Sequence, residues 1–146
     1  MAPPPEVRNQ VPIFKYQGSM NNQLPKTQTK KYYLEERTAR FAENLIDVLR
    51  KLPNTPINKR LVEQAAGSGG SLGANYCEAN EAESRMDFIH KIGICKKETK
   101  ETKHWIRLLA HANSEFIEDF RILWREAEEL LLIFSAITRS TKTKKN

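Results

Sequence analysis

Long apolar runs and cysteines are scarce in this sequence, and each shortage excludes a class of protein. No stretch of the 146 residues approaches the roughly 20 apolar side chains that a bilayer-spanning helix needs, so we expect no membrane helix. Cys77 and Cys95 are too few for a secreted disulfide scaffold and fit a reducing compartment. The N-terminal MAPPPEVRNQ lacks the apolar core of a signal peptide, so we expect a cytoplasmic location.

Motifs that carry catalysis or hold metals and cofactors are also missing. The glycine-rich stretch at 67–73 has no lysine where a P-loop needs one, and it does not match G-x-G-x-x-G. Glu101 and His104 form one Glu-x-x-His, but a di-iron bundle needs a second copy on another helix. The two cysteines lie in separate segments without a C-x-x-C. We therefore expect no enzyme activity, no catalytic residue, no metal site and no cofactor.

Basic charge is concentrated at the two ends of the chain. Residues 1–31 carry a net charge of +4 and residues 139–146 another +4, whereas residues 32–138 hold 15 basic and 17 acidic side chains. Five of the seven prolines also lie in residues 1–31, so we expect a flexible basic arm there and a fraying basic tail at 139–146. Any nucleic-acid contacts should come from these tails, whose candidate residues are Lys26, Lys30, Lys31, Arg139, Lys142, Lys144 and Lys145.

Between the tails, three segments have the periodicity of an amphipathic α-helix. Their interior positions alternate between spacings of three and four, as on a helix with one face on a core. These stripes are Leu34, Thr38, Phe41, Leu45, Val48 and Leu52, then Phe88, Ile92, Cys95, Thr99, Thr102, Ile106 and Leu109, and finally Phe116, Phe120, Leu123, Ala127, Leu130, Phe134 and Ile137. Thr55 and Ser84 are predicted N-caps, and Asn113 or Ser114 is predicted to cap the last helix. The short links predict an all-α, antiparallel up-down four-helix bundle over residues 32–138.

The remaining segment, at about 57–79, leaves two interpretations open. It begins with helical spacing and then contains Gly67, Gly69, Gly70 and Gly73, which together cost a helix roughly 3–4 kcal/mol relative to alanine. Either a loop interrupts the helix, or packing stabilises a helix whose small residues allow a neighbour to approach closely. Gly69 and Gly73 are four residues apart on one face, which favours the second interpretation.

Two stretches resemble the motifs of a known family. Residues 64–79 are QAAGSGGSLGANYCEA, and residues 87–109 are DFIHKIGICKKETKETKHWIRLL. In this order they are similar to the motifs of the four-helix-bundle proteins encoded by intervening sequences in bacterial large-subunit rRNA genes. Residues 33–53 are similar to the first helix of that family, so the resemblance covers about residues 32–138 and neither tail.

The resemblance implies an up-down-up-down bundle whose second helix continues through the glycines. It also implies a homopentamer. It implies no particular reaction, because none is established for the family, and the link of the family to rRNA comes mainly from gene location.

Polar residues near the interior stripes are the candidates for a site. Those that lie on an interior position or match the family motifs are Gln64, Ser68, Asn75, Glu78, Glu98 and Thr102. Buried polar groups need hydrogen-bond partners, and paired groups fix the register of neighbouring helices. The set predicts either a polar layer that locks the second helix against the third or a small ligand-binding site. Asn75 in particular is expected to be a buried structural residue.

A row of apolar residues beside the last stripe predicts self-association. Ile117, Trp124 and Leu131 are spaced by seven, and the core of one bundle does not need them. We therefore expect a non-enzymatic homo-oligomeric scaffold or binding protein, with the number five taken from the family resemblance. The alternative is an RNA- or DNA-binding accessory protein that acts through its basic tails.

Overall fold

Helices account for nearly all of the described chain. The computed structural model describes the backbone of residues 26–143 and the side chains of residues 33–143. Four long helices follow one another: α1 (Lys26–Arg50), α2 (Pro56–Asn80), α3 (Arg85–Ala112) and α4 (Ile117–Thr143), with a 3-10 turn at Ser114–Phe116 before α4. No strand occurs within residues 26–143, and the predicted all-α class is confirmed.

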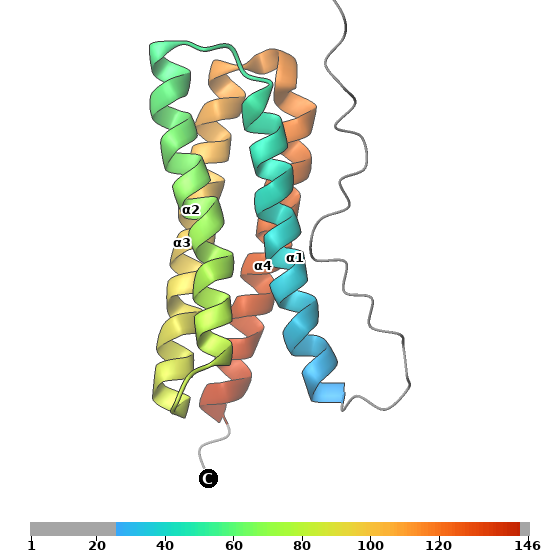
Figure 1. Ribbon diagram of the computed structural model, residues 1–146, viewed down its shortest axis with the longest axis vertical. Coiled ribbons are helices and arrows are strands. Elements are labelled where there is room, and N and C mark those ends of the chain that lie inside the picture. The colour runs from blue at the N-terminus through green and yellow to red at the C-terminus, as the bar shows by residue number, and fades with distance from the viewer. Residues whose placement is uncertain (1–25, 144–146) are drawn as a thin grey trace, which may run out of the picture.

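The four helices are arranged as an antiparallel bundle. Consecutive helices run in opposite directions and lie side by side (Figure 1). Among neighbouring helices, contacts are most extensive where α3 packs along α2 and α4, and they are fewest between α1 and α4. The N-terminal part of α1 leans away from the other three helices (Figure 1). The bundle therefore has a tightly packed three-helix body with α1 laid mainly against α2.

Two predicted N-caps are present, and the third is different. The Thr55 hydroxyl accepts a hydrogen bond from the backbone N–H of Asn58 at 3.1 Å, and the Ser84 hydroxyl accepts one from Asp87 at 3.0 Å. These bonds satisfy N–H groups that have no partner within the helix. Asn113 precedes the 3-10 turn without making a side-chain cap bond, because its amide is engaged elsewhere.

Both terminal helices extend beyond the boundaries expected from the sequence. α1 begins at Lys26, inside the arm predicted for residues 1–31, since residues 26–31 contain neither proline nor glycine. α4 continues through the predicted tail to Thr143, where threonine hydroxyls bond to carbonyls one turn back. Thr141 donates to the Ile137 carbonyl at 2.7 Å, and Thr143 donates to that of Arg139 at 3.1 Å. Residues 1–25 and 144–146 lie outside the described part of the chain.

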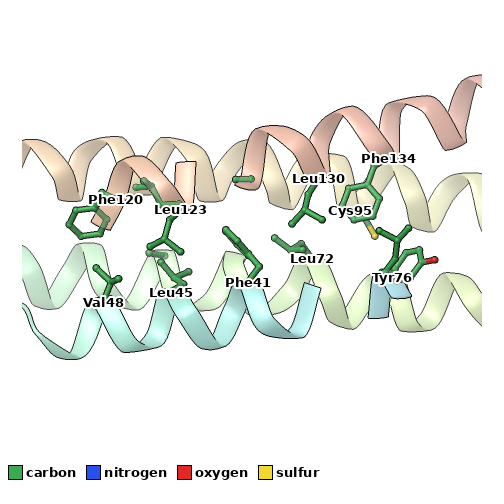
Figure 2. Packing of buried hydrophobic residues seen from close by; sticks show 14 of the residues in the cluster. Phe41, Leu45, Val48, Leu72, Tyr76, Cys95, Phe120, Leu123, Leu130 and Phe134 are labelled. Atoms are coloured by element: carbon green, nitrogen blue, oxygen red, sulfur yellow. The ribbon is translucent and has the colours of Figure 1, made fainter. Parts of the chain in front are cut away.

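Most of the core is formed by residues that the stripes predict, and α2, for which no stripe was predicted, adds Ala65, Leu72, Tyr76 and Ala79. Figure 2 shows their side chains pointing into the space between the helices. The largest fully buried apolar side chains are Phe41, Leu45, Leu72, Ile92, Ile106, Leu109, Phe120, Leu130 and Phe134. The rings of Tyr76 and Phe134 meet at a centroid distance of 5.9 Å, which joins α2 to α4 near the end where α2 turns into α3. Burial of these side chains is the main force that holds the bundle together.

The glycine-rich segment is helical throughout, which confirms the second interpretation. Gly69 and Gly73 face α1: a Cβ added at Gly69 would overlap Leu45 Cδ2, and one at Gly73 would lie 3.0 Å from Thr38 Oγ1. A Cβ added at Gly67 or Gly70, on the outer side, would meet nothing within 4 Å. The missing side chains on the inner face let α1 approach α2 closely, and that packing offsets the low helix propensity of glycine.

Candidate interaction site

One hydroxyl pair forms a polar layer between α2 and α3. Ser68 and Thr102 are both buried, and their hydroxyl oxygens are hydrogen-bonded at 2.9 Å. Thr102 Oγ1 also lies 2.7 Å from the Glu98 carbonyl, and Ser68 donates to the Ala65 carbonyl at 3.4 Å. Because both hydroxyls are satisfied, the pair joins the helices at this height without leaving an unpaired polar group.

The other residues predicted for this layer do not join it. Asn75 is half-buried, and its amide donates to the Ser71 carbonyl of its own helix at 2.8 Å, so it bridges no helix pair. Glu78 is exposed and forms an ion pair with Lys91 of α3 at 2.6 Å. Gln64 and Glu98 are half-buried, and Glu98 contributes its backbone carbonyl. The expectation of a buried structural Asn75 is wrong, because its side chain is only half-buried and bonds within α2.

A second buried polar cluster lies at the end of the bundle where α2 begins and α3 ends. The Asn58 and Asn113 amides exchange two hydrogen bonds of 2.8 Å, although the residues are 5% and 3% exposed. Asn58 also donates to the Pro53 carbonyl and Asn113 to the Leu109 carbonyl, each at 2.9 Å. Both amides use both N–H groups, so the cluster ties the α1–α2 link to the end of α3. The sequence pointed to Asn113 only as a cap, and nothing in the periodicity indicated Asn58.

An apolar groove with an arginine-rich lining runs between α3 and α4. Its volume is about 420 Å³, and its lining is Ile106, Arg107, Ala110, Ile117, Phe120, Arg121, Trp124 and Arg125. Two of the three predicted interface residues meet here, with Ile117 44% and Trp124 40% exposed. Leu131 is half-buried and lies outside the groove. We call this surface the basic groove.

The Trp124 ring is held from one side by a cation. Lys103 Nζ of α3 lies 4.2 Å from the ring centroid, and the same ammonium forms an ion pair with Glu128. Such a cation–π contact is worth roughly 0.5–1 kcal/mol at an exposed site. The contact favours this orientation of Trp124, whose exposed part lines the groove.

A smaller groove follows the other flank of α4, between α4 and α1. Its volume is about 240 Å³, and its lining is Phe41, Asn44, Asp47, Val48, Asp119, Ile122, Leu123 and Glu126. Arg37 bonds to both carboxylate oxygens of Glu126, at 2.6 and 3.0 Å, and also pairs with Glu129. These bonds, that to Glu126 above all, raise the pKa of Arg37 above its ordinary value. We call this surface the acidic groove.

The described side chains show no cluster with metal-binding chemistry. In residues 33–143, no three His, Cys, Asp or Glu side chains gather where they could hold a metal ion. Cys95 is buried in the core, and burial raises the pKa of its thiol to about 12, so it stays protonated near neutral pH. Burial also raises the pKa of the more exposed Cys77.

The residues proposed for nucleic-acid contact are placed only in part. Arg139 and Lys142 are exposed in the last turns of α4. Lys26, Lys30 and Lys31 belong to the first turns of α1, where the structure describes only the backbone. Lys144 and Lys145 lie outside the described residues. No helix in residues 26–143 is both long and apolar enough to cross a membrane.

The architecture places the protein in the class of antiparallel four-helix bundles, with a glycine-lined contact between its first two helices. Within that class, residues 30–136 match the family model of the 23S rRNA-intervening sequence proteins, and the chain belongs to that family. It is also similar to a crystal structure of a protein with unknown function from the S23 ribosomal protein family of Bacteroides thetaiotaomicron. That match has 30% sequence identity and a TM-score of 0.66, and it covers 72% of this chain and 97% of the other. No curated protein matches significantly.

Proposed function

We propose that the protein is a non-enzymatic scaffold that works as a homo-oligomer, with five copies as the expected number. The observation that carries the proposal is the basic groove, where Ile117 and Trp124 remain exposed beside a core that is already complete. Exposed apolar side chains gathered in one groove are typical of an interaction surface. The number five rests on the family resemblance. A cytoplasmic location belongs to the same proposal, because both cysteines are free thiols.

The bundle suits such a role because its interior is fully used for packing. The largest core side chains are completely buried, and both buried hydroxyl and amide clusters are satisfied within the chain. A rigid body of this kind presents its outer helix faces in fixed positions. The chemistry available for binding therefore lies on the surface grooves and at the ends of the helices.

Light scattering coupled to size exclusion tests the oligomer directly. At micromolar concentration we expect a mass well above the monomer mass of 16.9 kDa, and about 85 kDa if five copies assemble. A mass of 16.9 kDa over this range would contradict the proposal.

A second candidate function is RNA or DNA binding through the basic tails. Its support is the net charge of +4 on residues 139–146 together with the exposure of Arg139 and Lys142 at the end of α4. Each phosphate contact releases counterions, so the affinity should fall steeply with salt and depend little on base sequence.

Glutamine substitution of the C-terminal basic residues tests this candidate without shortening either helix. The tail variant changes Arg139, Lys142, Lys144 and Lys145, and the matched control changes four exposed basic residues of the body, Lys59, Arg60, Lys97 and Lys100. We expect the tail variant to bind RNA at least tenfold more weakly than the control in a filter assay at low salt. Equal binding by the two variants would contradict the tail hypothesis.

A further inference from the structure

The basic groove carries positive charge that no carboxylate of residues 33–143 neutralises. Among residues 33–143, Arg107 and Arg125 have no carboxylate partner, whereas Arg121 forms an ion pair with Glu118. The groove therefore presents two uncompensated cations beside Ile117 and Trp124. A fitting partner would combine apolar side chains with about two negative charges.

The acidic groove of the same chain has this complementary composition. Ile122 is 65% exposed in it. Asp47 has no cationic partner within the described residues, and the cluster of Arg37 with Glu126 and Glu129 leaves one further negative charge. Asp119 lies 3.9 Å from Lys51, which offsets its charge. One uncompensated carboxylate, Asp47, thus lines the groove beside an exposed isoleucine, and the adjoining cluster of Arg37, Glu126 and Glu129 adds a second negative charge at its edge.

The two grooves lie at the same height on opposite flanks of α4. α4 contributes residues 117–125 to the basic groove, which it shares with α3, and residues 119–126 to the acidic groove, which it shares with α1. Two parallel copies placed side by side could therefore bring the basic groove of one against the acidic groove of the next without sliding along the helix axis. The two grooves differ, so a contact between them is heterologous. Heterologous contacts form a closed ring when the rotation from one copy to the next divides a full turn evenly.

We propose that the acidic groove of one copy docks into the basic groove of the next, with Ile122 packed against Ile117 and Trp124 and with Asp47 facing Arg107 and Arg125. This inference rests on the proposed homo-oligomer and assigns its interface. A second copy is the fitting occupant, because one chain displays both the apolar and the charged halves of the contact. Each copy uses both grooves, so a ring of any size leaves neither exposed.

Two interface variants and one control test the assignment on the full-length protein. The basic variant carries Arg107→Glu and Arg125→Glu, the acidic variant carries Asp47→Lys and Ile122→Lys, and the control reverses exposed charges of α2 with Lys59→Glu and Arg60→Glu. Circular dichroism establishes that each variant retains the helical content of the wild type. Light scattering should then give 16.9 kDa for each interface variant and the wild-type mass for the control.

Mixing the two interface variants distinguishes a heterologous contact from a symmetric one. Each variant retains one intact groove, so the mixture should regain a mass above 16.9 kDa through the acidic groove of the basic variant and the basic groove of the acidic variant. Two folded variants that remain monomeric when mixed would overturn the heterologous arrangement.

The outcomes also separate this inference from the proposed function. An oligomeric wild type whose interface variants keep its mass would overturn the groove assignment and leave the homo-oligomer intact. A monomeric wild type would overturn both. If the basic variant keeps its oligomeric mass but loses binding to single-stranded RNA, the basic groove is a nucleic-acid site and the docking assignment is wrong.

Discussion

Two neighbouring glycines of α2 allow a matched test of how closely α1 packs. Gly69 faces α1, where an added Cβ would overlap Leu45 Cδ2, whereas an added Cβ at Gly70 would meet nothing within 4 Å. Gly69→Ala and Gly70→Ala are the same chemical change in the same helix. They gain the same helix propensity, about 1 kcal/mol each, so any difference between them measures the helix contact.

The magnitude follows from the surroundings of the added methyl group. Gly70→Ala should raise the free energy of unfolding by about 1 kcal/mol, because the methyl lies in open space. At Gly69 the overlapped side chain of Leu45 is 1% exposed, and Thr102 Cγ2 would lie 3.7 Å away from the same methyl. Overpacking of this kind costs roughly 1–3 kcal/mol. Gly69→Ala should therefore be less stable than Gly70→Ala by about 1–3 kcal/mol.

Thermal unfolding followed by circular dichroism provides the measurement, at one fixed protein concentration because assembly shifts the midpoint. At roughly 4 °C per kcal/mol, the two variants should differ by about 4–12 °C. Leu45→Ala combined with Gly69→Ala should cost less than the sum of the single changes, because the added methyl enters the space that the leucine leaves. If Gly69→Ala is as stable as Gly70→Ala, α1 does not approach α2 at this level and the packing argument fails.

Three further predictions concern the buried polar groups and the thiols. Thr102→Val should destabilise the protein by about 0.5–1.5 kcal/mol in a urea titration. Adding Ser68→Ala should restore part of this loss, because both partners are then apolar. If the effects of the two substitutions simply add, the two hydroxyls are not paired. Asn113→Ala should cost about 1–3 kcal/mol by the same assay because it leaves a buried amide without its partner, and an unchanged midpoint would show that the amide pair contributes nothing. Ellman's reagent at pH 8 should modify Cys77 and leave Cys95 unmodified until the protein unfolds. Burial excludes the reagent from Cys95 and raises the pKa of its thiol to about 12. Modification of two thiols in the native protein would refute this prediction.

Periodicity predicted the helices and their buried faces because those features depend on local spacing. The alternation of threes and fours that runs from Ile92 through Leu109 corresponds to positions that are buried in α3. Thr55 and Ser84 were predictable as caps for a similar reason, since a cap needs only a side-chain oxygen within three residues of a free N–H. Helix ends were less predictable. Residues 26–31 contain no residue that excludes a helix and no clear signal that starts one, so the start of α1 at Lys26 could not be read from the sequence.

The residues of the polar layer between α2 and α3 were predictable only where they lie on one of the interior stripes. Thr102 is on such a stripe and forms the expected polar contact with Ser68 across α2 and α3. The prediction of a buried Asn75 was wrong because burial depends on how α2 packs against its neighbours, which spacing along one helix does not specify. The Asn58–Asn113 pair joins residues 55 positions apart, so no local pattern could have indicated it.

By itself, the sequence determined the class of fold, the identity of most core residues and the family, because the spacing of apolar residues and the order of motifs are properties of the linear sequence. The tertiary structure decided three other matters: that α2 continues through four glycines, that two asparagines pair at one end of the bundle, and that arginines and carboxylates gather on opposite flanks of α4. Each of these depends on how closely and at what rotation the helices meet. That geometry is set by side chains from different helices packing together, so it exists only when the helices are assembled.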